Sequence, residues 1–332
     1  MRTKRLLLVA LAAATMLTAC GNGASDEPSM SLTVGYTAIG AAYSDLYVCE
    51  DKGVFKKNGL DVKLTRLNSS SQLLASLSSN SVNIGAGVAS STAAGILRGV
   101  DLRYVALPMP VYYLEMWGKP ELKSDDDLKG KKVGLSSPGS LGDAAFHAWL
   151  ADKGMDGQVE PVYLKNVPAE VAALEQGAVD AIVTQPPNGT QTRDKGFEKI
   201  RDFTEYPAAA NAYTTTGEYL EVNSKAVQAF VKSEVECLSI LHQDKKQAIE
   251  SIRKHSGQDD ESLAEYSYDF FVKLWSKEPR VHPELIKAAF EDAAEETGKP
   301  VPADTDKYVD NSFLDKLKKD GYIDDLYQGE AG

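Results

Sequence analysis

The sequence has little of several features on which particular functions depend. It contains only three cysteines in 332 residues and no Cys-x-x-Cys or His-Glu-x-x-His spacing, so neither a disulfide-dense scaffold nor a familiar zinc site is predicted. Basic residues are in deficit as well, with 36 Lys and Arg against 48 Asp and Glu and a formal charge of −12. Such a chain repels nucleic acid, so we expect no nucleic-acid partner, and we predict neither a metal nor a cofactor.

No catalytic motif is complete. The segment Gly134-Leu135-Ser136-Ser137-Pro138 misses the Gly-x-Ser-x-Gly elbow because proline replaces the second glycine. The run that begins at Gly85 resembles the start of a dinucleotide fingerprint, but Ser90 replaces its third glycine. The histidines lie far apart in the sequence, and we expect each to be a surface or packed side chain: His147, His242, His255 and His282. The sequence therefore predicts a protein that is not an enzyme.

An apolar run stands at the N-terminus, where residues 6–17 follow three basic residues. This run is shorter than the roughly 20 residues that a membrane-spanning helix needs, so residues 1–19 are predicted to be a signal peptide. Leu17-Thr18-Ala19-Cys20 resembles a bacterial lipoprotein box, in which the cysteine carries the lipid, and residues 20–30 then form a polar tether. The alternative is a plain cleaved signal with an incidental Cys20. Lipidation would place the protein outside the cytoplasm, anchored to the cell membrane.

The rest of the chain contains two similar halves about one hundred residues apart. From Leu32 and again from Lys131, apolar runs alternate with helix-like segments, a βαβαβ pattern. We expect a duplicated α/β lobe, with two crossovers: lobe 1 from residues 31–109 and 207–332, and lobe 2 from residues 110–206. A strand over residues 102–107 is expected to be interrupted at Pro108-Met109-Pro110, and the chain is predicted to be almost wholly helical from Ser224 onward.

Hydroxyl groups are frequent in the loops that follow the expected strands. Serines at positions 69–71, 90–91, 136, 137 and 140 precede helices, where free N–H groups can hold a polar or negative ligand. For any single serine a helix cap is the commoner explanation, and the case for a site rests on the convergence of several loops. Tyrosines mark the same regions and either cover a ligand or are half-buried strand residues: Tyr36, Tyr43, Tyr112, Tyr113 and Tyr163. The absence of Arg from these loops favours a neutral or singly charged ligand.

The roles of two acidic residues and two cysteines are left open by the sequence. Glu115 and Asp143 could contact a cationic or amide group, although a solvated acid at a strand end or helix start is the commoner explanation. Cys49 and Cys237 both fall in lobe 1, where they form either a disulfide or two buried free thiols.

Longer stretches of the chain resemble a known family. The segments GYTAIGAAYSDLYVCEDKGVFKKNGLDVKL, QLLASLSSNSVNIGAG, DDDLKGKKVGLSSPGS and VAALEQGAVDAIVTQP are similar to the solute-binding proteins of ABC importers, in the group of sulfonate, taurine, nitrate and thiamine-precursor binders. The likeness covers most of residues 31–240. It implies a two-lobed periplasmic-binding-protein fold of type II, a small-molecule ligand in the cleft, and ABC permease subunits as partners of a monomer.

The resemblance also implies a set of ligand-binding positions. To the tyrosines Tyr112 and Tyr163 it adds Tyr36, Thr37, Ser70, Ser71, Ser90, Ser91, Gly139, Ser140, Leu141, Thr184 and Gln185. The chain has Thr184-Gln185-Pro186-Pro187 where many sulfonate-like members have a Trp-Asp-Pro-Tyr type sequence. The expected function is therefore binding a small polar or anionic organic molecule, such as a sulfonate, carboxylate or pyrimidine. The alternatives are a pyrimidine-forming synthase on the same fold, and a sensor lobe for a surface receptor.

Overall fold

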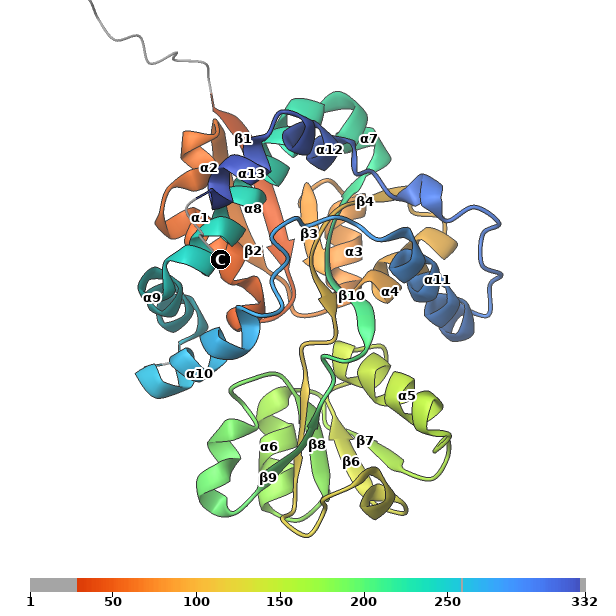
Figure 1. Cartoon of the computed structure of the whole chain (residues 1–332). Helices are drawn as coiled ribbons and strands as arrows, with labels where there is room; N and C mark the ends of the chain where they lie inside the picture. Colours follow the sequence, from red (N-terminus) through yellow and green to blue (C-terminus); the bar gives the residue numbers. More distant parts are fainter. Residues whose placement is uncertain (1–28, 258, 329–332) are drawn as a thin grey trace, which may run out of the picture.

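Two lobes lie one above the other and are joined by two connecting segments (Figure 1). The computed structural model describes residues 29–257 and 259–328, so the predicted signal peptide and Cys20 lie outside the described residues. Each lobe is built on a five-stranded mixed sheet. Within the described ranges, no helix combines the length and the apolar character needed to cross a bilayer.

The sheet of lobe 1 has the strand order β2-β1-β3-β10-β4. Its strands are β1 (Met30–Tyr36), β2 (Leu60–Arg66), β3 (Ile84–Gly87), β4 (Leu102–Val111) and β10 (Pro207–Thr216). Strand β1 pairs in parallel with β2 and β3, whereas β10 runs antiparallel to β3 and β4.

The sheet of lobe 2 repeats this arrangement in the order β7-β6-β8-β5-β9. Its strands are β5 (Glu115–Gly118), β6 (Lys132–Leu135), β7 (Glu160–Tyr163), β8 (Ala181–Thr184) and β9 (Glu198–Asp202). Here β6 pairs in parallel with β7 and β8, and β5 runs antiparallel to β8 and β9. The two halves that the sequence pattern predicted thus have matching strand orders.

Most helices belong to lobe 1. They are α1 (Ser44–Asp51), α2 (Val54–Lys57), α3 (Ser70–Ser78), α4 (Ala89–Leu97), α7 (Gly217–Val222), α8 (Ser224–Gln243), α9 (Lys245–Ser256), α10 (Glu261–Phe271), α11 (Pro283–Thr297), α12 (Ser312–Lys319) and α13 (Tyr322–Tyr327), with the short 3-10 turns η1 (Ala41–Tyr43) and η4 (Asp306–Tyr308). Lobe 2 holds α5 (Leu141–Lys153), α6 (Val167–Glu175), η2 (Asp125–Leu128) and η3 (Thr190–Lys195). The expectation of a helical chain after Ser224 is confirmed.

Strand β4 differs from the sequence expectation. It continues through Pro108 and Pro110 to Val111, so these prolines do not interrupt it. The physical reason is its position at the edge of the sheet, where the ladder to β10 is irregular around the prolines and the missing N–H of proline is tolerated. The connecting segment between the lobes is therefore the short stretch 112–114, and a second segment, 203–206, returns the chain to β10.

Close packing on the sheet of lobe 1 requires small residues in β3. A Cβ placed on Gly85 would lie 2.9 Å from Leu73 Cδ1 and 3.0 Å from Leu77 Cδ1. Both leucines are buried on α3, so the glycine lets this helix rest directly on the strand. This contact fixes α3, and with it the loop between β2 and α3, at the end of the sheet.

A disulfide connects α1 to α8. The Sγ atoms of Cys49 and Cys237 lie 2.07 Å apart, and both residues are fully buried. Of the two alternatives that the sequence left open, the structure contains the disulfide. The cross-link ties the helix after β1 to a helix that follows the return of the chain from lobe 2, across 188 residues of sequence.

Three ionisable side chains are buried beside this cross-link in the core of lobe 1. Asp45 Oδ2 accepts a hydrogen bond of 2.7 Å from the Tyr213 hydroxyl, and the Glu234 carboxyl group lies next to Asp45. Burial, together with the neighbouring Asp45, raises the pKa of Glu234 well above its ordinary value. Glu234 therefore retains its proton, so the two neighbouring carboxyl groups are not both charged.

Candidate functional site

The two lobes meet where their parallel strands end. Gln185, directly after β8, donates a hydrogen bond of 3.2 Å through Nε2 to the carbonyl oxygen of Ile39, in the loop after β1. Gly40 is required at this contact, because a Cβ there would lie 2.7 Å from Gln185 Nε2 and because its φ of 155° is one that other residues rarely adopt. In folds of this type, ligands bind outside the carboxyl ends of strands.

A small cavity of about 60 Å³ lies at this meeting point. Its lining residues are all uncharged and come from the loop after β1, the loop after β8, and helices α9 and α10: Ile39, Gly40, Ala41, Gln185, Pro186, Pro187, Asn188, Ile252, Ser256 and Ser267. The amides and hydroxyls can donate and accept hydrogen bonds, whereas no lining side chain supplies a full charge. A larger groove of about 620 Å³ lies elsewhere, between α8, α12 and α13 of lobe 1, and does not contact lobe 2.

Three of the predicted residues gather around Asp143 at the start of α5. The Asp143 carboxylate accepts hydrogen bonds of 2.8 Å from the Gly139 amide and from the Tyr163 hydroxyl. Ser140 caps the helix, since its Oγ accepts a 3.3 Å bond from the Asp143 amide. Partial burial and this carboxylate raise the pKa of Tyr163 to about 12, so Tyr163 is a hydrogen-bond donor at neutral pH. Asp143 thus holds this loop together through hydrogen bonds and is not a solvated acid.

A second group of predicted residues lies at the end of β1. The Thr37 hydroxyl is 3.2 Å from that of Tyr43, and the Tyr36 ring centroid lies 5.4 Å from the Tyr43 ring. Tyr43 is buried, and its burial raises its pKa. Tyr36 and Thr37 remain half-buried and keep part of their surface accessible to a ligand.

The remaining predicted residues are spread over the two lobes. Ser90 and Ser91 occupy the first turn of α4, and its N-cap, Val88, offers no side-chain hydrogen bond. The first turn of α3 holds Ser70 and Ser71 and is capped by Ser69, whose Oγ accepts a 3.2 Å bond from the Gln72 amide. Tyr112 and Thr184 are buried, and Leu141 packs partly buried against the main core. Of the predicted ligand-binding set, Gln185 alone lines the small cavity.

The structure corrects the interpretation of Glu115 as a solvated acid. This side chain is fully buried. Its Oε1 lies 3.1 Å from Lys199 Nζ, and its Oε2 accepts a 2.9 Å bond from Trp117 Nε1. The cause is the position of β5 between β8 and β9, which covers both sides of the strand.

Several residues at the meeting point were missed by the sequence analysis. Ser256 and Ser267 lie on α9 and α10, more than two hundred residues after the loop at Ile39 that they face across the cavity. Asn188 follows the cis peptide bond between Pro186 and Pro187. No local pattern marks these positions, because only the path of the C-terminal helices brings them to the cavity.

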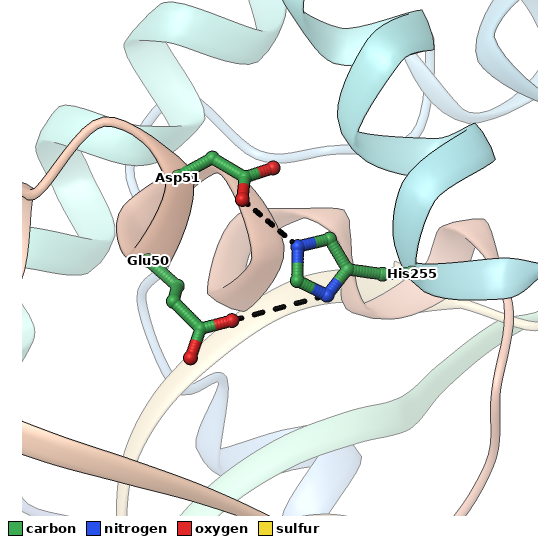
Figure 2. Close-up of side chains that lie close together, drawn as sticks. All are labelled: Glu50, Asp51 and His255. Atoms are coloured by element: carbon green, nitrogen blue, oxygen red, sulfur yellow. Dashed lines mark hydrogen bonds and ion pairs between the residues drawn. The ribbon is translucent and has the colours of Figure 1, made fainter.

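A cluster of Glu50, Asp51 and His255 lies near the end of α9 (Figure 2). His255 Nε2 is 3.0 Å from Asp51 Oδ1, whereas its Nδ1 is 3.9 Å from Glu50 Oε2. The two carboxylates thus face different ring nitrogens of His255, so each is engaged with the histidine itself. Lys254 also pairs with Asp51, and the His255 ring stacks on Tyr47 with centroids 4.5 Å apart. These contacts describe an ion-pair network that joins α1 to α9.

Comparisons with known proteins agree with this architecture. Residues 41–248 match the family described as NMT1/THI5 like, and no protein of curated function matches the chain in sequence. The periplasmic aliphatic sulphonate binding protein of Escherichia coli is similar in structure, with a TM-score of 0.69, 20% identity, and coverage of 81% of this chain and 92% of that one.

Two further solved structures extend the likeness. The periplasmic nitrate-binding protein of Synechocystis PCC 6803 has a TM-score of 0.73 and 15% identity, covering 91% of each chain. A Candida albicans protein, described as having the generic periplasmic binding protein structural fold, has a TM-score of 0.63 and 17% identity, covering 87% of this chain and 95% of that one. The two-lobed α/β fold expected from the sequence is therefore confirmed.

Proposed function

Because the chain belongs to the NMT1/THI5-like family, we propose that it is the extracytoplasmic solute-binding lipoprotein of an ABC importer. It would bind one small polar organic molecule between its lobes and deliver it to the permease. The observation that carries this proposal is the meeting of both sets of strand ends at a cavity rimmed by hydrogen-bonding side chains. Such a site suits reversible binding by closure of two lobes.

The chemistry of the site favours a ligand that is neutral or carries a single charge. The lining of the small cavity is uncharged, and Ser140 and the first turn of α4 offer neutral donors. Similar proteins are named for binding aliphatic sulphonates and nitrate, both singly charged anions. We therefore include sulfonates, carboxylates, pyrimidines and nitrate among the candidate solutes.

A thermal-shift screen of the mature protein tests the proposal. Taurine, a short carboxylate, a pyrimidine and nitrate are added separately, and a ligand present at one hundred times its Kd stabilises the folded state by about 2.7 kcal/mol. Saturable one-to-one binding is expected for one class, without chemical change in the compound. Chromatographic detection of a new product would favour the synthase alternative instead, and no shift with any class would contradict the proposal.

Two substitutions test the assignment of the site. Ser91→Ala and Ser140→Ala are each expected to weaken the binding of the stabilising compound by about fivefold to tenfold, because the family resemblance places both hydroxyls at the ligand, outside the lining of the small cavity itself. Ser79→Ala, at the exposed end of α3, serves as the control. Unchanged affinity in both site variants would show that the ligand lies elsewhere.

A further inference from the structure

Helix α10 of lobe 1 makes a direct polar contact with lobe 2. The Tyr266 hydroxyl donates a hydrogen bond of 2.6 Å to Glu115 Oε1, between residues 151 positions apart. Helix α10 packs against α9 and η1 of lobe 1, whereas Glu115 begins β5, an internal strand of the lobe 2 sheet. The bond therefore joins the two lobes outside their two connecting segments.

Tyr266 completes the hydrogen bonding of a buried charge. Lys199 and Trp117, both of lobe 2, supply two donors to the Glu115 carboxylate, and Tyr266 supplies the third. Burial and the bond to Glu115 raise the pKa of Tyr266 to about 12, so its hydroxyl keeps its proton throughout the physiological range. A carboxylate with no exposed surface loses this donor if the lobes separate, and water must then replace it.

A second contact between the lobes lies on the same side of the molecule. Gln185 of lobe 2 donates to the Ile39 carbonyl of lobe 1, and Ser267, the neighbour of Tyr266 on α10, lines the cavity formed there. Neither contact involves a solute. The two hydrogen bonds thus close one edge of the meeting surface with groups of the protein alone.

We propose that Tyr266 is a positioning residue for lobe closure, whose bond to Glu115 holds the lobes together before a solute is bound. This inference rests on the proposed function only to explain what the bond is for, because the contact itself needs no ligand. In the solute-binding cycle, the bond would set the fraction of protein that is already closed and so the apparent affinity for the solute.

The test uses the ligand-free mature protein. Small-angle X-ray scattering compares the wild type with Tyr266→Phe, which removes only the hydroxyl. We expect the wild type to scatter as the closed arrangement, and the variant to shift the ratio of closed to open molecules by about tenfold or more, with a larger radius of gyration. Tryptophan fluorescence is an independent readout, because the ring of Trp117, one of three tryptophans, donates to the same carboxylate.

Tyr322→Phe is the matched control. Its hydroxyl bonds to Glu236 within lobe 1, so its loss should change neither the scattering curve nor the tryptophan emission. In the double variant Tyr266→Phe with Glu115→Gln, the effects should be non-additive, because both changes act on one bond.

The inference is overturned if Tyr266→Phe remains folded and scatters like the wild type, or if the ligand-free wild type is already open. An effect as large in Tyr322→Phe would overturn it too. Because no solute is used, failure of the solute screen would leave this result unaffected, and the two proposals can fail separately.

Discussion

Glu234 and Asp45 show how a single buried residue can give the whole protein a pH dependence. In the folded protein Glu234 retains its proton at pH values where an unfolded chain, with an ordinary pKa near 4.5, has lost it. Its contribution to stability is therefore complete below that ordinary pKa and declines as the pH rises toward the raised one. The buried pair thus favours a slightly acidic medium.

We predict that Glu234→Gln makes stability less dependent on pH. Glutamine cannot ionise, so the variant should lose less free energy of unfolding between pH 5 and pH 8 than the wild type, whose decline can reach about 1.4 kcal/mol per pH unit. Urea unfolding at pH 5, 6.5 and 8 measures this difference. Glu236→Gln is the control on the same helix, because hydrogen bonds from Lys57, Tyr322 and Asn58 outweigh burial and lower the pKa of Glu236. Parallel pH curves for the wild type and Glu234→Gln would refute the explanation.

At the scale of elements, the disulfide joins α1 and α8 across a long stretch of chain. We predict that Cys49→Ala with Cys237→Ala lowers the free energy of unfolding by about 2–5 kcal/mol, since the cross-link restricts an unfolded loop of 188 residues. Chemical denaturation measures the change. Treating the wild type with dithiothreitol under denaturing conditions should reproduce the shift, and the double variant should not respond to the reductant. A wild type whose unfolding midpoint is insensitive to reduction would count against a stabilising cross-link.

The alternation of apolar runs and helical segments was enough to predict the elements and the duplicated lobes. It failed at Pro108 and Pro110, because tolerance of proline depends on whether a strand lies at a sheet edge, which is a property of the assembled sheet. Glu115 was misjudged for a similar reason. Its burial follows from neighbours on β8 and β9 that come much later in the chain.

The candidate site was predicted only in part, for the same physical reason. Gly139, Ser140 and Tyr163 are brought together locally by Asp143, so a helix-start pattern could find them. The cavity at Ile39 also needs α9 and α10, whose placement depends on long-range packing in lobe 1. No spacing in the sequence encodes that placement.

At the scale of the whole molecule, the proposed lipid anchor predicts the cell fraction in which the protein is found. Cys20→Ser should release the protein from the membrane fraction or leave it unprocessed, because the modified sulfur would be the point of lipid attachment. Immunoblots of cell fractions and the mass of the mature protein measure this. The Cys49→Ala, Cys237→Ala variant should stay with the membrane. A mature wild type without added lipid mass would exclude the anchor.

The position of β10 between β3 and β4 determines the order in which the molecule can be completed. All strands of lobe 2 lie in one uninterrupted stretch that ends at Asp202, so this lobe can form its sheet while the rest of the chain is still being made. Lobe 1 begins first, yet the strand that joins β3 to β4 in its sheet is missing until residues 207–216 arrive, and its cross-link waits for Cys237. The earliest half to start is thus the last to finish, and during synthesis its apolar strands depend longest on protection from aggregation.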